Sequence, residues 1–198
     1  MSDAGAGAPE QGDRGLLRDD PFEATVTSSE VVFEGAVWNV VRDVVDYDGS
    51  SITREYVAHT GAVAIMAIDD QERVLVIKQY RHPIRSRDWE LPAGLLDQEG
   101  ESLVDAARRE LAEEADLEAD TWDQLVAFHT SPGGNDETVT VFRATGVRAT
   151  SEAFAREAEE ADIEVRWVAL DEIVRGVLEG RLKNSILSIA ALAAAAAR

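Results

Sequence analysis

The sequence predicts an α+β fold, a mixed sheet with flanking helices, on three observations. Short runs rich in Val and Ile recur through most of the chain, with turn-forming residues between them. One long helix with an apolar stripe is predicted near the middle, and a helical pattern returns near the C-terminus. These elements do not alternate as they do in a doubly wound parallel sheet. We therefore expect strands and helices to occupy separate layers around one core.

Composition limits the possible functions. The 198 residues, 45% of them hydrophobic, fit one domain with an N-terminal extension and a packed core. A formal net charge of −20 repels phosphate backbones, so no nucleic-acid polymer is expected as a partner. The absence of Cys excludes thiolate nucleophiles and Cys-ligated zinc, and the three His show no ligand spacing. Any metal would be held mainly by oxygen, which favours Mg²⁺, Mn²⁺ or Ca²⁺.

The two ends of the chain carry no targeting or membrane signal. Residues 1–20 are rich in Gly, Ala, Asp and Pro, and we expect a disordered tail without the apolar core of a signal peptide. The Ala-rich stretch 186–197 is too short to span a bilayer. A cytoplasmic protein without membrane association is expected.

Residues 21–57 are expected to form an N-terminal antiparallel β-sheet. Val-rich runs occupy 31–33 and 37–45, and a turn at Asp48-Gly49-Ser50 precedes a further strand at 52–57. This ribbon carries more apolar side chains than it can bury alone, because isolated hairpins are only marginally stable. We expect a dimerisation segment; the alternative is that the ribbon folds back onto its own domain.

Residues 58–198 are expected to form the main domain. The apolar runs 61–67 and 74–79, separated by four polar residues, predict a hairpin. Further strands are expected at 89–91, 125–128, 138–144 and 163–169, helices at 102–115 and 171–196 (one helix or two), and a short helix or loop at 153–161.

The central helix carries acidic residues on its apolar side. An apolar stripe repeats every four residues, at Leu103, Ala107, Leu111 and Ala115. At about 100° per residue, with Glu110 at zero, Glu114 falls near ~40°, inside a stripe that extends from about 20° to about 140°. A carboxylate beside a core is unfavourable unless it is paired or ligated. The pattern therefore differs from an ordinary solvated acidic face.

Three acids within about one helical turn, Glu110, Glu113 and Glu114, would repel one another. A divalent cation neutralises them most simply, so we expect a metal site, with a purely structural role as the alternative. Arg109 is expected to pair with an acid such as Glu101, which lies at the N-terminal end of the helix, where negative charge complements the helix dipole.

This segment resembles the Nudix box. Gly94 to Glu101, followed by Arg109-Glu110-Leu111-Ala112-Glu113-Glu114, follows the family pattern of Gly, five residues, Glu, seven residues, Arg-Glu-apolar-any-Glu-Glu-any-Gly-apolar. Six residues separate Gly94 from Glu101, an insertion that a loop can absorb. Asp116 replaces the last Gly, which would suit a left-handed helix cap that Asp tolerates less well. The resemblance implies a Nudix α/β/α sandwich.

Three other segments resemble the ADP-ribose pyrophosphatase branch of the Nudix family. They are Gln79-Tyr80-Arg81, Trp89 to Gly94, and Ser131 to Glu137. Pro132 stands 15 residues after Leu117, a spacing that is typical of this branch. The resemblance covers residues 31–192 and leaves mainly the N-terminal tail outside it.

The resemblance implies a metal site for Mg²⁺, or alternatively Mn²⁺, made of the Ala93 backbone carbonyl with Glu110, Glu113 and Glu114. Glu114 and Glu137 are the implied catalytic residues. Glu137 lies in a Gly-rich loop that we expect to be mobile, and it would act as general base or close the metal site. Without the resemblance, this loop would be interpreted as a polar turn.

Substrate contacts are implied for Arg54, Arg81, Leu95 and Pro132. Arg81 would pair with a phosphate, and Arg54 would face a phosphate or the adenosine. Phe33 and Trp38 lie in the region that the branch uses for adenine contact, often across a dimer interface. The alternatives are two surface arginines and two aromatic side chains of a strand core.

The implied function is Mg²⁺-dependent hydrolysis of the pyrophosphate bond of ADP-ribose, giving AMP and ribose 5-phosphate, by a homodimer with no organic cofactor. The same box would serve a hydrolase of other nucleoside diphosphate sugars or of oxidised nucleotides, because it acts on the pyrophosphate. A catalytically silent nucleotide sensor is the other alternative. Such a sensor would show losses among the box carboxylates, and none is lost here.

Overall fold

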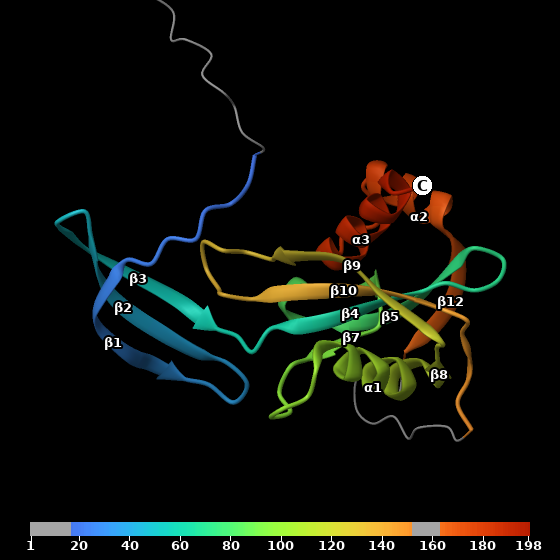
Figure 1. Ribbon diagram of the computed structural model, residues 1–198, viewed down its shortest axis with the longest axis horizontal. Coiled ribbons are helices and arrows are strands. Elements are labelled where there is room, and N and C mark those ends of the chain that lie inside the picture. Colours follow the sequence, from blue (N-terminus) through green and yellow to red (C-terminus); the bar gives the residue numbers. More distant parts are fainter. Residues whose placement is uncertain (1–16, 152–162) are drawn as a thin grey trace, which may run out of the picture.

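The computed structural model describes residues 17–151 and 163–198. Figure 1 shows a three-stranded sheet at the N-terminal end, set beside a larger domain of sheets and helices. Most of the tail expected at 1–20, and the short helix or loop expected at 153–161, lie outside the described residues.

The N-terminal sheet is antiparallel, in the order β1-β2-β3, as the sequence predicts. Its strands are β1 (Thr25–Glu34), β2 (Asn39–Tyr47) and β3 (Ser50–Ala58). Asp48 and Gly49 join β2 to β3, and both have positive φ angles, 51° and 77°. This conformation matches the right-handed twist of a hairpin and favours an Asp-Gly pair, so the predicted turn is confirmed.

The larger domain is built on two sheets. The first is mixed, in the order β7-β4-β10-β9, with β4 and β10 parallel. The second has the order β12-β5-β6 and is antiparallel. The strands are β4 (Ala62–Ala67), β5 (Arg73–Arg81), β6 (Ser86–Glu90), β7 (Ala93–Leu95), β9 (Thr121–His129), β10 (Thr138–Thr145) and β12 (Glu164–Ala169); β8 (Leu117–Glu118) pairs with β11 (Arg148–Ala149), and a 3-10 turn occupies His82–Ile84.

The hairpin predicted between 61–67 and 74–79 is wrong. Strand β4 pairs with β7 and β10, whereas β5 pairs with β6 and β12 in the other sheet. A single bridge, Ile68 to Val74, joins the two segments. The physical reason is that all six residues of β4 are buried, as in a central strand covered on both faces.

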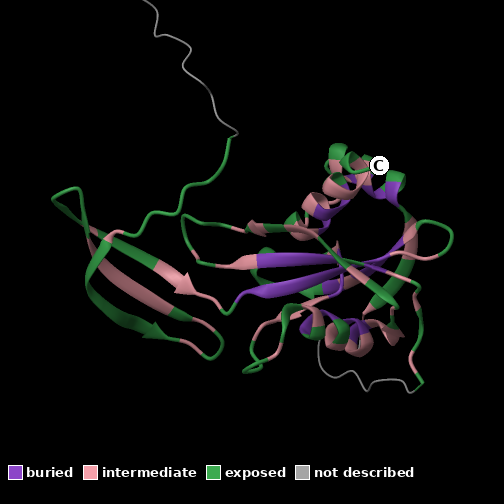
Figure 2. Cartoon of the chain, viewed as in Figure 1, coloured by how far each residue is buried: buried purple, intermediate pink, exposed green. Residues whose placement is uncertain are grey.

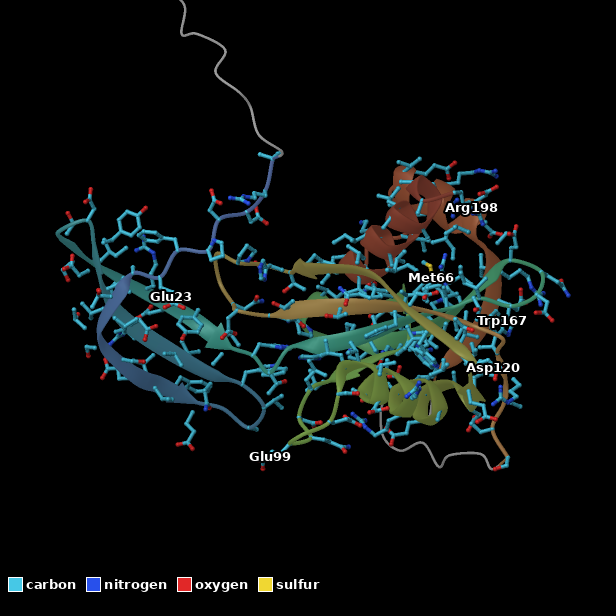
Figure 3. The ribbon with its side chains drawn as sticks, in the orientation of Figure 1. Glu23, Met66, Glu99, Asp120, Trp167 and Arg198 are labelled. Atoms are coloured by element: carbon cyan, nitrogen blue, oxygen red, sulfur yellow. The ribbon has the colours of Figure 1, made fainter. Side chains whose placement is uncertain are left out.

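Helices cover both faces of the mixed sheet, as expected for the α/β/α arrangement (Figure 1). They are α1 (Leu103–Ala115) on one side, and α2 (Leu170–Leu178) with α3 (Ser185–Ala196) on the other. Alternate residues of β4 belong to opposite core clusters: Ile65 packs in the cluster with α1, and Met66 in the cluster with α2 and α3. Figure 3 shows Met66 within this densely filled interior. The predicted α+β fold class is confirmed.

Helix α1 begins and ends with specific caps. Ser102, the N-cap, accepts a hydrogen bond from the Asp105 amide at 3.2 Å. Asp116, which replaces the family Gly, adopts the left-handed conformation with φ 54° and ψ 39°, and its amide donates to the Ala112 carbonyl at 3.0 Å. The cap that a Gly would provide is therefore made here by Asp, at a conformational cost of about 1–2 kcal/mol.

Fully buried residues are confined to the larger domain in Figure 2, where most of β4 and β10, the two central strands of the mixed sheet, is coloured as buried. All ten residues of β1 are exposed, and Phe33 and Val37 expose 62% and 70% of their surface. Within one chain, the N-terminal sheet therefore has no core of its own among the residues the structure describes. In the same residues, no helix combines the length and apolar character needed to cross a membrane.

Candidate active site

The box helix α1 is attached to β7 by a buried carboxylate. Glu114 is only 6% exposed, and its Oε2 accepts a hydrogen bond from the Ala93 backbone amide at 2.9 Å. This confirms that Glu114 lies on the core side of α1. The hydrogen bond offsets part of the desolvation of the carboxylate, and it places Glu114 beside the residue whose carbonyl is another predicted metal ligand.

Gly94 follows Ala93 in β7 and faces Glu110. A Cβ atom added to Gly94 would lie 1.9 Å from both Cδ and Oε1 of Glu110, far inside van der Waals contact. Only glycine leaves room for this carboxylate against the strand. Glycine is therefore needed at the first position of the box because the Glu110 carboxylate lies against it.

Arg109 joins the acidic residues of the box. Its Nε and Nη2 donate to the two carboxylate oxygens of Glu101, each at 3.1 Å, so the predicted pair is bidentate. Its Nη1 donates to Glu110 at 2.5 Å and to Glu113 at 3.1 Å. Hydrogen bonding to Glu101, together with the charge of Glu110, raises the pKa of Arg109 above its ordinary value.

Glu110 lies in an unfavourable environment for a charged carboxylate. Burial raises the pKa of Glu110, and the nearby Glu113 and Asp97 raise it further, whereas Arg109 lowers it. Positive charge near this group would stabilise its ionised form.

The predicted ligands do not form a closed cage. Among the described residues, no three acidic or His side chains are already arranged around a common point. Arg109 bonds to both Glu110 and Glu113, Glu114 is directed to an amide, and the Glu113 side chain is 42% exposed. The carboxylates expected to converge on a cation are thus held close together by a guanidinium. Of these carboxylates, Glu113 is the most exposed, so its side chain could rotate toward a predicted ion with the least restriction.

The loop from Ser131 to Glu137 is tied to the end of β3. The Gly134 carbonyl accepts a hydrogen bond from the Val57 amide at 2.9 Å, and Asp136 Oδ1 accepts one from the His59 amide at 2.7 Å. These bonds hold the loop in a defined turn against the end of β3, and its mobility stays a prediction.

Sheet register brings this loop to the same end of the sheet as the start of the box. Leu95, Ala62 and Val139 lie in one row across β7, β4 and β10, with neighbouring strands about 4.8 Å apart. Gly61, with φ at +84°, precedes the row, and its carbonyl accepts a hydrogen bond from the Leu96 amide at 3.1 Å. The predicted loop acid stands two residues before Val139. Box and loop therefore meet across three strands.

Glu137 is held by two neighbours at this end of the sheet. The Thr130 hydroxyl donates to its Oε2 at 2.6 Å, and Nε2 of His59 lies 3.3 Å from its Oε1. The His59 ring stacks on Trp38, with centroids 4.1 Å apart and planes at 21°. Trp38 therefore reaches the site, whereas Phe33 is exposed on the N-terminal sheet. Sequence reasoning did not single out His59 or Thr130, because neither belongs to a spaced motif.

The predicted substrate residues occupy different environments. Arg81 donates from Nε and Nη2 to the buried Glu90 at 2.9 and 2.6 Å, so a carboxylate fixes its orientation. Arg54 lies exposed on β3, in the N-terminal sheet, and donates to the Thr53 carbonyl at 2.8 Å. Leu95 is half-buried in β7, and Pro132 is exposed in the loop. Glu90 is a site neighbour that the sequence alone did not indicate.

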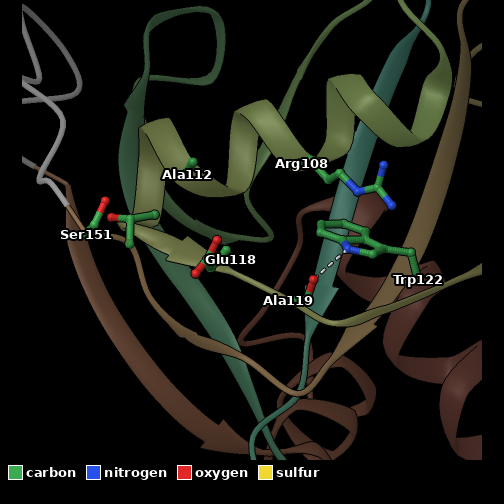
Figure 4. Close-up of a pocket in the computed structure, with 7 residues that line it drawn as sticks. Arg108, Ala112, Glu118, Ala119, Trp122 and Ser151 are labelled. Atoms are coloured by element: carbon green, nitrogen blue, oxygen red, sulfur yellow. Dashed lines mark hydrogen bonds between the residues drawn. The ribbon is translucent and has the colours of Figure 1, made fainter.

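A separate hollow of about 500 Å³ lies beside α1 (Figure 4). Trp122 forms part of its wall and donates from Nε1 to the Ala119 carbonyl at 3.1 Å. The Arg108 guanidinium lies 5.9 Å from the centre of the Trp122 ring. None of the predicted site residues lines this hollow, which is bounded by Arg108, Ala112, Glu118, Ala119, Trp122, Thr150 and Ser151.

Two features are typical of one protein family: the acids of the box lie against β7, and helices cover both faces of the mixed sheet. Comparison with known sequences identifies that family. The NUDIX domain model matches residues 58–188. The chain therefore belongs to the Nudix family, as the box predicts.

Individual relatives carry more specific names than the family model. The chain is 47% identical to an ADP-ribose pyrophosphatase of Mycobacterium tuberculosis (strain ATCC 25618 / H37Rv), covering 84% of this chain and 80% of the relative. It is 37% identical to an ADP-ribose pyrophosphatase of Bacillus subtilis (strain 168), covering 78% and 83%. A methanol dehydrogenase activator of Bacillus methanolicus is 34% identical, with 85% and 91% covered. The solved structure of an ADP compounds hydrolase matches the fold with a TM-score of 0.70 at 20% identity, covering 88% of this chain and 93% of that one.

The contact between Gly94 and Glu110 predicts a specific energetic coupling. Gly94→Ala should destabilise the protein by about 1–3 kcal/mol, the usual penalty for overpacking a filled site. In a Glu110→Ala background the carboxylate is gone, so the same change should have much less effect. Urea unfolding of the single and double variants measures both quantities. Gly133→Ala is the control, since its new methyl meets nothing within 4 Å; equal Gly94→Ala penalties in the two backgrounds would contradict the contact.

Proposed function

We propose that this protein hydrolyses the pyrophosphate bond of ADP-ribose to AMP and ribose 5-phosphate, with Mg²⁺ as cofactor. The observation that carries the proposal is the complete set of box acids, with Glu110 and Glu114 lying against β7 and Glu113 beside them on the exposed side of α1. The Nudix match and the two ADP-ribose pyrophosphatase relatives support the predicted pyrophosphohydrolase class.

The donor set fits a hard divalent cation. The ligands we propose are the Ala93 carbonyl with Glu110, Glu113 and Glu114, all of them oxygen donors. Burial raises the pKa of Glu110, and the charge of Glu113 adds to this effect, so these side chains would gain from added positive charge. When bound, Mg²⁺ would neutralise the pyrophosphate and lower the pKa of a bound water. Mn²⁺ has the same oxygen preference.

The chain's own residues would orient the reacting groups. Arg109 holds Glu110 and Glu113 close together and is itself fixed by Glu101. Glu137 would accept a proton from the attacking water. Arg81, oriented by its hydrogen bonds to the buried Glu90, would contact a phosphate oxygen.

Contacts to the rest of the substrate would come from both parts of the fold. Leu95 and Pro132 lie at the sheet end that carries the box and the loop. Trp38 would contact the adenine at the same end, next to His59. Arg54 and Phe33, on the N-terminal sheet, would act on the substrate of a partner subunit.

A substrate panel tests the proposed activity. The protein would be incubated with Mg²⁺ and, in turn, ADP-ribose, other nucleoside diphosphate sugars and oxidised nucleotides, and kcat/KM would be compared. ADP-ribose should give the highest value, with AMP as product. A higher kcat/KM for another compound would make that compound the proposed substrate in place of ADP-ribose. No turnover of any compound would favour a nucleotide-binding role.

Glu114→Gln should lower kcat by at least about a hundredfold, because it removes a charged ligand from the metal site. The free energy of unfolding should change by less than about 1.5 kcal/mol, since the Gln carbonyl can still accept the Ala93 amide hydrogen bond. Steady-state rates at saturating Mg²⁺ measure the change in kcat, and urea unfolding measures the change in the free energy of unfolding. Turnover near that of the parent would remove Glu114 from the metal site.

Glu137→Gln should slow the chemical step by about 10²–10⁴, the usual contribution of a general base. Substrate affinity should hold, because Gln retains the length and polarity of the side chain. Single-turnover rates and KM distinguish the two effects. A sharp rise in KM with kcat maintained would make Glu137 a binding residue.

The exposed apolar side chains of the N-terminal sheet support a homodimer. Several lie on one part of the molecule and remain exposed within their own chain: Val26, Val31, Val32, Phe33, Val37 and Tyr47. A second copy would bury them and close the edge of β1. The proposal includes a shared active site, with the N-terminal sheet of one subunit contacting the substrate of the other.

Light scattering at micromolar concentration should give about twice the chain mass of 21.5 kDa. Phe33→Glu with Val37→Glu should yield a folded monomer with little ADP-ribose hydrolysis, although the box is untouched, because neither side chain is buried in its own chain. Leu178→Glu, at a 74% exposed position on α2, is the matched control and should remain dimeric and active. A monomeric parent, or a fully active monomeric variant, would contradict the shared site.

A further inference from the structure

The orientation of the Glu137 carboxylate depends on a histidine in another part of the chain. Nδ1 of His59 accepts a hydrogen bond from the Gly61 amide at 3.0 Å. In a neutral ring the proton must then be on Nε2, because an acceptor nitrogen carries none. Nε2 is the atom that faces Oε1 of Glu137, at 3.3 Å. The Gly61 amide thus sets the tautomer that can donate to the carboxylate.

The second oxygen of the same carboxylate is also held. The Thr130 hydroxyl donates to Oε2 at 2.6 Å. The side chains of His59 and Glu137 are only 11% and 17% exposed, so little water competes for these bonds. Each carboxylate oxygen has two acceptor positions. One donor on each oxygen therefore fixes the group and still leaves an acceptor position for a water proton.

Trp38 supports the His59 ring from the outside. The two rings are stacked, with a centroid separation of 4.1 Å. The segment that carries Trp38 is tightly folded, because a Cβ on Gly35 would lie 2.2 Å from the Trp38 carbonyl oxygen. The His59 amide is fixed as well, since it donates to Asp136 at 2.7 Å. His59 is therefore restrained at its backbone, at Nδ1 and on one ring face, which leaves Nε2 directed at Glu137.

We propose that His59 is a positioning residue for the hydrolysis. It donates a hydrogen bond from Nε2 to Oε1 of Glu137 and fixes the direction in which that carboxylate accepts the proton of the attacking water. His59 keeps its own proton throughout, and the proton of the water is transferred to Glu137. This role rests on the proposed function, in which Glu137 is the base.

Two substitutions separate the donor from the ring. His59→Phe keeps a flat ring to stack on Trp38 and removes the Nε2 donor, whereas His59→Gln keeps an amide donor of similar reach. The first should lower kcat on ADP-ribose by about ten- to a hundredfold, the loss expected for a hydrogen bond to a charged group, with KM changed by less than about threefold. The second should recover most of the loss. His82→Phe is the matched control, because the exposed side chain of His82 contacts Tyr80, which has no role in the proposed site, and it should leave both constants unchanged.

A double variant tests whether His59 acts through Glu137. Once Glu137→Gln has removed the base, adding His59→Phe should lower kcat no further. Full multiplication of the two losses would show that His59 supports the fold independently of Glu137, and it would overturn the proposal. Equal losses for His59→Phe and His59→Gln would overturn it too.

A crystal structure of the His59→Phe variant gives a measurement that does not depend on turnover. The Glu137 carboxylate should rotate away from its position between Thr130 and residue 59, with the loop backbone retained by its bonds to Val57 and Ser131. An unmoved carboxylate would overturn the positioning role. If the parent protein hydrolyses no compound of the panel, the proposed function fails, and this structural comparison still decides what His59 does to Glu137.

Discussion

The site depends on one constraint: carboxylates of α1 must lie against the backbone of β7. Glu114 accepts a hydrogen bond from Ala93, and Glu110 occupies the space that a side chain at position 94 would need. Acids placed so close to a core are stable only when paired. Arg109 supplies the pairing charge, and Glu101 fixes Arg109 with two hydrogen bonds. The spacing of the box residues therefore reflects one connected arrangement of strand β7, helix α1 and the Arg109 guanidinium.

Local features of the fold were predictable because they depend on neighbours in sequence. The Asp48-Gly49 turn and the apolar stripe of α1 each follow from the preferences of a few adjacent residues. The left-handed position at Asp116 was implied by the resemblance, because the family pattern has Gly there. The pairing of β4 was not predictable in the same way. Its apolar run indicates burial on both faces but does not name its partners, and the choice of β10 over β5 depends on contacts some 75 residues apart (for example Val139 with Ala62).

The same distinction applies to the site. The inward position of Glu114 could be predicted, since helical geometry fixes it. The pairing of Arg109 with Glu101 was expected only as one of several acid partners, because Glu101 precedes α1 and helical geometry does not fix its position. The partners of Arg81 and Glu137 could not, because Glu90 and His59 reach them only through sheet register and a close approach of two loops. The metal ligands and the dimer stay predictions. The acids of the box are close together but bound to a guanidinium, and the N-terminal sheet shows exposed apolar surface without showing what covers it.

Electrostatics ties the proposed function to the cation. The chain carries a net charge of −20, and its proposed substrate is an anion. The two guanidinium groups nearest the proposed chemistry are already engaged by acids: Arg109 by three of them, and Arg81 by the buried Glu90. Neither brings net positive charge to a pyrophosphate, because each belongs to a neutral or acidic group of side chains. In the proposed function, the attraction needed for the substrate would come from cations bound by the same acids, so substrate affinity as well as turnover should depend on the metal.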